Sequence, residues 1–191
     1  MPIVENVMFG LSSLALLSQI GIALLGLLYI GTKIGIQPCN TWYERICTIL
    51  SSNTVAFAFV VVLVAMLGSL FFEHVAGWDP CTLCWWQRIF MYPQVFILGV
   101  ALYLKRKDVF QYTILLSSIG GIIALYHWWL QLSKVLFPAA PTSVCSLSGP
   151  SCAFTPTMTF GYITIPMLAL TAFCLTIVSF LIHRKIKTEY T

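Results

Sequence analysis

The sequence is short of charge. Asp, Glu, Lys and Arg make up only 8% of its 191 residues, whereas about 25% is usual for a soluble domain. Six acidic and ten basic side chains cannot cover a globule of this size, which excludes an ordinary soluble protein. A disordered chain would be more polar and more highly charged. The net charge of +4 is spread thinly, so we expect no nucleic-acid partner. Because 59% of the residues are hydrophobic, we expect a lipid bilayer to be the solvent.

Five apolar runs are long enough to cross a hydrocarbon core of about 30 Å, which takes roughly 20 residues. They span residues 7–29, 54–72, 85–104, 109–132 and 162–182. The segments between them are short, so we predict an all-α integral membrane protein with one bundle of transmembrane helices. The first run is longer than the apolar part of a signal peptide, about 7–15 residues, so we expect it to be retained as a helix.

The basic residues predict the orientation. Eight of the ten lie in alternate connections and in the tail, and all eight therefore fall on one side of the membrane. They are Lys33, Arg45, Lys105, Arg106, Lys107, Arg184, Lys185 and Lys187. Short loops rich in Lys and Arg stay in the cytoplasm. We therefore predict that the N-terminus is outside and the C-terminus is cytoplasmic.

In that orientation, four of the seven cysteines fall on the outer, oxidising side as two pairs, Cys81 with Cys84 and Cys145 with Cys152. The first pair has two intervening residues at a helix start, so its sulfurs can meet across one turn. A thiolate at Cys84 would be stabilised by the positive end of the helix dipole and by Arg88, one turn later. We interpret this pair as redox-active. The other cysteines are interpreted as plain thiols and are Cys39, Cys47 and Cys174.

Arg88 and His127 are the ionisable side chains within the five runs. Such residues are costly in a membrane unless they are partnered, so they are candidates for function. Both lie near the outer leaflet among Trp and Tyr residues, and together they suit a planar quinone head group. An interfacial aromatic belt and a snorkelling Arg88 explain the same residues without function. Gly120 and Gly121 predict a close approach of the fourth helix to a neighbour.

Two other interpretations of the cysteines are open. The first pair could be half of a zinc site completed by Cys145, Cys152 and His74. The wide spacing of the second pair and the oxidising compartment argue against this, so we expect no metal. Both pairs could instead be structural disulfides, which would leave Arg88 beside the first pair unexplained.

Four segments carry a resemblance to a known family. They read WDPCTLCWWQR at residues 78–88, MYP at 91–93, HWWLQL at 127–132 and ITIPMLALTAF at 163–173. In this order they resemble the disulfide bond formation protein B (DsbB) family, most of all its BdbC-like branch. The resemblance implies a four-helix thiol oxidase core over residues 54–183. Residues 1–53 would add an extra N-terminal transmembrane helix and a cytoplasmic loop, and 184–191 a basic cytoplasmic tail.

The resemblance also implies a function. The protein would sit in a bacterial plasma (inner) membrane and reoxidise a DsbA-like thioredoxin-fold protein on the outer face. It would pass the electrons to the membrane quinone pool, either ubiquinone or menaquinone. By this resemblance, Cys145 would form the mixed disulfide with the partner, and Cys152 would be the residue that pairs with Cys145. Cys81 would exchange with this second pair, and Cys84 would pass electrons to the quinone. Arg88 and His127 would bind the quinone head group.

Two alternative functions are a VKOR-type quinone or epoxide reductase and a non-catalytic membrane subunit with structural disulfides. In the VKOR type the CxxC pair follows the loop pair, whereas here it comes first, at Cys81. The non-catalytic subunit predicts no quinone reduction when reduced partner is added.

Overall fold

The computed structural model describes residues 2–106, 109–137 and 150–189. These residues form six helices: α1 (Pro2–Ile34), α2 (Gln37–Ser52), α3 (Thr54–His74), α4 (Thr82–Tyr103), α5 (Phe110–Leu136) and α6 (Ile165–Glu189). The described residues contain no strand beyond a single bridge between Thr159 and Ile163. The predicted all-α class is confirmed.

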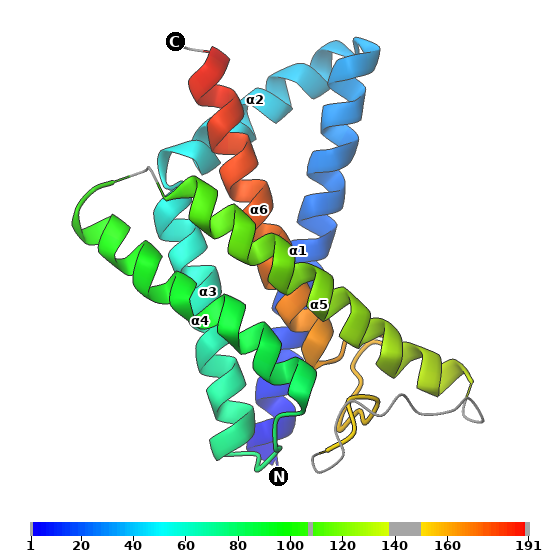
Figure 1. The fold of residues 1–191 in the computed structure, drawn as a ribbon. Helices are drawn as coiled ribbons and strands as arrows, with labels where there is room; N and C mark the ends of the chain where they lie inside the picture. Colours follow the sequence, from blue (N-terminus) through cyan, green and yellow to red (C-terminus); the bar gives the residue numbers. More distant parts are fainter. Residues whose placement is uncertain (1, 107–108, 138–149, 190–191) are drawn as a thin grey trace.

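Helices α3, α4, α5 and α6 form a four-helix bundle in which each helix packs on two neighbours, and α1 joins it along α6. The chain runs up and down, so the N-terminus lies at the same end as the connection before α4 and the segment before α6 (Figure 1). The C-terminus and α2 lie at the opposite end. The segments that carry Cys81, Cys84 and Cys152 therefore lie at the same end of the bundle.

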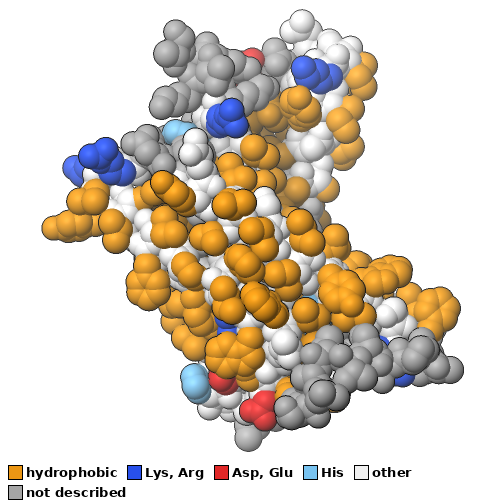
Figure 2. Space-filling view, in the orientation of Figure 1, with side chains coloured by type: hydrophobic (Ala, Val, Ile, Leu, Met, Phe, Trp, Pro, Cys, Tyr) orange, Lys and Arg blue, Asp and Glu red, His pale blue; other side chains and the backbone are white. Residues whose placement is uncertain are grey.

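Most of the buried side chains of the bundle are apolar, and so are those on its outside. Phe173 and Phe180 of α6, Leu98 of α4 and Val62 of α3 are fully buried between the helices. Large hydrophobic side chains also cover the middle of the face in Figure 2, between ends that carry most of its charged groups. A helix that is apolar on all sides lies either in a protein core or in a membrane, and the exposed apolar surface of this bundle indicates a membrane.

Four of the described helices are long and apolar enough to cross a membrane: α1, α3, α5 and α6. Helix α4 has 22 residues but is less apolar, because it carries Gln87, Arg88 and Gln94 as well as Pro93. It packs between α3 and α5, in the place predicted for the third span. That α4 spans the membrane stays a prediction.

The connection expected as a cytoplasmic loop after the first span contains a helix, because residues 37–52 form α2. That this segment is cytoplasmic stays a prediction. Its apolar and polar residues alternate with the helical period but its overall apolarity is low, so a search for apolar runs does not find it. Cys47 faces inward, whereas Trp42 and Ile49 are exposed. The Ser51 carbonyl oxygen lies 2.8 Å from Nδ1 of His183 on α6. The expected tail at 184–191 also begins inside a helix, since α6 continues to Glu189.

The predicted close approach at Gly120 is confirmed. A Cβ at this position would lie 2.3 Å from Cζ of Phe173, so the phenyl ring of α6 occupies the space that a side chain would need. At Gly121 the nearest atom, Cβ of Phe173, would be 3.6 Å away, which is ordinary contact. Nearby, the Ser117 hydroxyl of α5 donates to Oε1 of Gln94 on α4 at 3.0 Å. Small residues and interhelical hydrogen bonds of this kind hold membrane helices together.

We expect Gly120→Ala to destabilise the protein, because the added methyl group would clash with the fully buried Phe173 ring and force it to shift. Overpacking typically costs about 1–3 kcal/mol, and the gain in helix propensity, about 1 kcal/mol, offsets only part of it. Gly121→Ala is the matched control and should be neutral or stabilising. Thermal unfolding in detergent checks this. Equal midpoints for the two variants would show that the approach to Phe173 is not tight.

Candidate functional site

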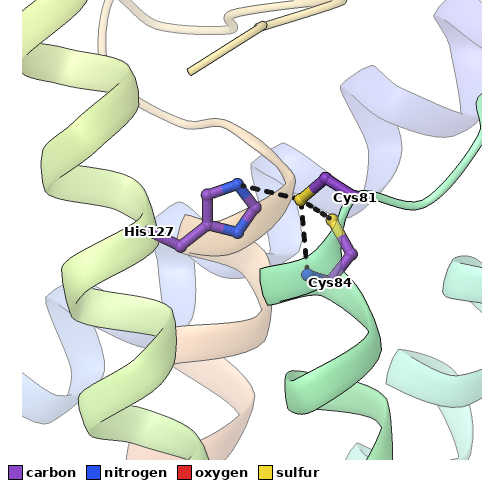
Figure 3. Close-up of side chains that lie close together, drawn as sticks. All are labelled: Cys81, Cys84 and His127. Carbon is purple, nitrogen blue, oxygen red and sulfur yellow. Dashed lines mark hydrogen bonds between the residues drawn. The ribbon is translucent and has the colours of Figure 1, made fainter. Parts of the chain in front are cut away.

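The Cys81–Cys84 pair lies where the chain enters α4. Cys81 is the N-cap residue, and its sulfur accepts a hydrogen bond from the Cys84 amide at 3.4 Å. Both cysteines are thiols in this structure, and the Cys81 thiol donates to the Cys84 sulfur, with the sulfurs 3.2 Å apart (Figure 3). The predicted meeting of the two sulfurs across one turn is therefore what the backbone produces.

The pKa values of the two thiols are shifted in opposite directions. Both residues precede Trp85, where the predicted span begins. The hydrogen bond to Cys84, together with burial, raises the pKa of Cys81 to about 12, although His127 opposes the rise. The same hydrogen bond is the main reason that the pKa of Cys84 lies below its usual value. Burial opposes this, and the charge of Arg88 adds to it. A hydrogen bond to the charged form of a thiol favours that form. Cys84 is thus the more acidic thiol of the reduced pair, the one that forms a thiolate more readily.

We expect Cys84 to be alkylated by iodoacetamide at pH values where an ordinary thiol is still protonated. Its rate should fall only when the pH drops through its lowered pKa, because the thiolate is the reactive species. Cys81 should stay unmodified in the folded protein, since its pKa is about 12. Mass spectrometry of the alkylated peptides over a pH series measures both. In Arg88→Gln the profile of Cys84 should move to higher pH, and an unmoved profile would contradict the role of the Arg88 charge.

His127 comes from α5 and is 1% exposed. Its Nδ1 lies 2.8 Å from Nε2 of Gln87, an amide nitrogen that also donates to the Leu83 carbonyl. An amide NH₂ can only donate, so Nδ1 accepts and the ring proton is on Nε2. That nitrogen lies 3.0 Å from the Cys152 carbonyl oxygen and 3.6 Å from the Cys81 sulfur. His127 therefore presents an N–H to the cysteines, and Gln87 determines which nitrogen carries it.

Three of the four predicted redox cysteines are brought into one site. Cys152 is fully buried, and its carbonyl accepts from the same imidazole nitrogen that lies beside Cys81. The fourth, Cys145, lies outside the described residues. The structure thus places one member of the second pair next to the first pair.

Arg88 has a partner that the sequence interpretation missed. Its guanidinium forms an ion pair with Glu73 near the end of α3. It also donates to the hydroxyl and the carbonyl of Ser69, at 3.0 and 3.3 Å, and lies 5.2 Å from the centre of the Trp85 ring. Glu73 lies one residue beyond the predicted end of the second apolar run. An acidic residue there is a signal that could have been used, because the chain has only six acidic residues.

A cavity of about 600 Å³ opens beside these residues. Cys81, Cys84, Arg88 and His127 line it together with mostly apolar side chains of α1, α3 and α6. Ligand sites in proteins are commonly of this size and character, with apolar walls and a few polar groups that orient the ligand.

Comparison with known proteins identifies the family. The model of the family described as "Disulfide bond formation protein DsbB" matches residues 51–183. The chain belongs to the DsbB family. It is 42% identical over 135 residues to the probable disulfide formation protein C of Halalkalibacterium halodurans, which covers 70% of this chain and 95% of that protein. It is 39% identical over 140 residues to the disulfide bond formation protein C of Bacillus subtilis, covering 72% and 99%. No solved structure matches.

Membership of the DsbB family confirms the resemblance noted in the sequence. The protein is a membrane oxidoreductase of disulfide formation, built on an all-α fold. The α1 helix precedes the part that matches the DsbB family, and its role as an added transmembrane helix stays a prediction.

The ligand atoms of Cys81, Cys84 and His127 lie within 4.8 Å of one another, close enough to hold a metal ion. His74, considered from the sequence as a zinc ligand, is not part of this cluster. In a DsbB-family protein a disulfide and a metal would compete for the same two sulfurs, because zinc binds thiolates. The expectation of no metal stays a prediction.

Proposed function

We propose that the protein takes two electrons from a thioredoxin-fold dithiol partner outside the cell and delivers them to a membrane quinone. The observation that carries this proposal is the position of the first cysteine pair. Cys81 lies beside His127 and Cys152, and Cys84 lines the cavity with Arg88. One dithiol is thus next to both a second cysteine and a space for an apolar acceptor.

The reaction follows as two thiol–disulfide exchanges and one oxidation. The partner's dithiol reduces the Cys145–Cys152 disulfide by attacking Cys145, and the partner leaves with its own disulfide. The Cys152 thiolate then attacks Cys81, and Cys84 leaves as the thiolate. Once Cys145 has displaced Cys81, the second disulfide is restored and the first pair is a dithiol. The Cys81–Cys84 dithiol would return to a disulfide by giving two electrons and two protons to a bound quinone, which would leave as the quinol. Each exchange forms one S–S bond and breaks one, through attack of a thiolate.

His127 and the acidity of Cys84 suit these steps. An exchange is faster when the leaving thiol has a low pKa, and the pKa of Cys84 is lowered. The imidazole N–H can donate to the sulfur of Cys81 as it becomes a thiolate. Cys152 is fully buried, and its backbone carbonyl oxygen lies 3.0 Å from this nitrogen, which places the residue on the same side of His127 as Cys81.

The cavity fits a quinone. When bound, a quinone accepts two electrons and two protons. Its head group is planar and carries two carbonyl oxygens that can accept hydrogen bonds. Arg88 offers a guanidinium at the cavity wall, fixed by Glu73 and Ser69 of α3. Its charge favours both the Cys84 thiolate and an acceptor that gains electrons. The other walls are mostly apolar, as an isoprenoid ligand requires.

The proposed location is a bacterial plasma membrane, with the cysteine end of the bundle outside. Supporting this, α2, which contains Arg45, and the end of α1, which contains Lys33, lie at the opposite end from the two cysteine segments (Figure 1). Cytoplasmic loops of membrane proteins carry this excess of positive charge.

The experiment is an assay of quinone reduction by the purified protein in detergent, with a reduced thioredoxin-fold dithiol protein as electron donor. We expect ubiquinone or menaquinone analogues to be reduced only when both dithiol and enzyme are present. Cys174→Ser is the control for cysteine variants in this assay. It should be fully active, because Cys174 lies on α6 outside the cysteine cluster. If the dithiol is oxidised while no quinone is reduced, the acceptor is not a quinone.

A further inference from the structure

The helix α1 lies outside the region that defines the family, yet it forms part of the acceptor cavity. The match to the family begins at residue 51. The alignments with the two relatives named above include 95% and 99% of those proteins but only 70% and 72% of this chain. Four residues of α1 nevertheless line the cavity: Leu11, Leu14, Ala15 and Ser18. They recur every three or four residues and therefore share one face of the helix. Cys84 and Arg88 of α4 line the same cavity.

A polar attachment holds α1 in this position. Nε2 of Gln19 donates to the Thr171 hydroxyl of α6 at 2.8 Å, and the Tyr162 hydroxyl donates to Oε1 of Gln19 at 2.6 Å. Both ends of one amide are thus bonded to the bundle by groups far away in the sequence. The backbone carbonyl of Tyr162 in turn accepts from Trp128 of α5 at 2.9 Å. Hydrogen bonds like these join neighbouring helices in lipid.

The turn at residues 159–163, just before α6, contacts α1. Thr159 and Ile163 exchange two backbone hydrogen bonds of 2.9 Å, and Gly161 between them has φ +77°, which favours glycine. This turn carries Phe160, whose ring centre is 5.8 Å from that of Phe9 on α1, as well as Tyr162. One tight turn therefore supplies both an aromatic and a polar contact to the added helix.

We propose that α1 is a wall of the quinone site and sets which acceptors fit and how tightly they bind. This inference rests on the proposed quinone function and adds the residues that govern specificity. The face at Ala15 and Ser18 is the contact surface for the acceptor, and Gln19 is a positioning residue that fixes its distance from α4. The thiol exchange steps involve α4, α5 and the segment at Cys152, so α1 should not affect them.

The test fills the cavity from the α1 side. Ser18→Trp places a large ring at the cavity wall, whereas Leu17→Trp puts the same ring on the neighbouring residue, which is 66% exposed, and is the matched control. We expect Ser18→Trp to raise the KM for a quinone analogue about tenfold or more, as losing the fit of a few atoms does. The rate at which the dithiol partner reduces the Cys81–Cys84 disulfide should be unchanged. Leu17→Trp should match the wild type in both.

A binding readout separates the site from catalysis. A photoreactive azido-quinone should label the peptide that contains residues 11–18 in wild type and in Leu17→Trp, and should label it much less in Ser18→Trp. Gln19→Leu, which keeps the helix but loses both hydrogen bonds, should also raise the KM for quinone and leave the dithiol step intact. This variant keeps the test decisive if Ser18→Trp folds poorly.

The outcomes distinguish the two proposals. If the wild type reduces quinone but Ser18→Trp and Gln19→Leu keep its KM and its labelling, α1 is no wall of the site and the proposed function stands. If these variants slow the dithiol step as much as quinone reduction, α1 has a general structural role and the inference is wrong. If the wild type neither reduces nor binds quinone, the proposed function fails and the inference with it.

Discussion

Cys84→Ser is expected to lose quinone reduction, by a factor of about 10³ or more, because removing an essential nucleophile leaves little residual catalysis. Cys84 is the low-pKa thiol of the pair and lines the cavity. Without it the first pair cannot form a disulfide and cannot transfer two electrons to the acceptor. The remaining Cys81 then has no disulfide partner in α4 and should be found as a thiol, while Cys145 and Cys152 can still pair with each other. Quinone absorbance and non-reducing mass spectrometry measure the two effects.

Cys152→Ser gives the complementary result. We expect it to stop oxidation of the dithiol partner by about the same factor, while added quinone still oxidises Cys81 and Cys84 to a disulfide. Cys152 lies beside the His127 nitrogen on the exchange side of the pair, so only that side is broken. A Cys84→Ser protein that reduced quinone at the wild-type rate would show that the first pair is not the exit for electrons.

Arg88→Gln is expected to lower kcat/KM for quinone. The loss of transition-state stabilisation should be about 2–4 kcal/mol, the range for losing one group that stabilises developing charge. The guanidinium lines the cavity near Cys84, where negative charge appears during turnover. Arg88→Lys should lose part of this, because it keeps the charge but not the planar fork that bonds Ser69 and Glu73. Steady-state kinetics over a range of quinone concentrations separates affinity from rate.

A variant of Glu73 separates the charge of Arg88 from its ion pair. Glu73→Gln removes the ion pair but leaves the guanidinium, so we expect a smaller loss than in Arg88→Gln. The double variant should be less impaired than the sum of the two single effects, because the two side chains share one interaction. If Arg88→Gln and the wild type have the same affinity and rate, Arg88 only anchors α4 to α3.

The sequence predicted the helices well where apolarity alone determines them. The runs at residues 54–72 and 109–132 became α3 and α5 with a few residues added at their ends. Helix α2 was missed because its stability depends on an amphipathic face packed on α1 and α6, not on a long apolar run. The close approach at Gly120 was predictable from small residues at helical spacing, but its partner Phe173 was not, since it comes from another helix.

Within the site, the local features were predictable and the contacts between helices were not. The spacing of Cys81 and Cys84 at a helix start predicted their meeting, and Arg88 one turn later followed from the helical period. The neighbours of His127 depend on how α5 packs on α4, which no local pattern encodes. The same reason explains why the Glu73 partner of Arg88 was not predicted.

The measurement that tests the central claim most directly is a stoichiometric titration without oxygen. Oxidised protein with bound quinone receives the reduced dithiol partner in small amounts, and quinone absorbance is followed while the disulfides are mapped by mass spectrometry. We expect one quinone to be reduced for each partner disulfide formed, with the Cys81–Cys84 disulfide restored after each turnover. Partner disulfides that accumulate while the quinone stays oxidised and the Cys81–Cys84 pair stays unchanged would contradict electron transfer through this pair.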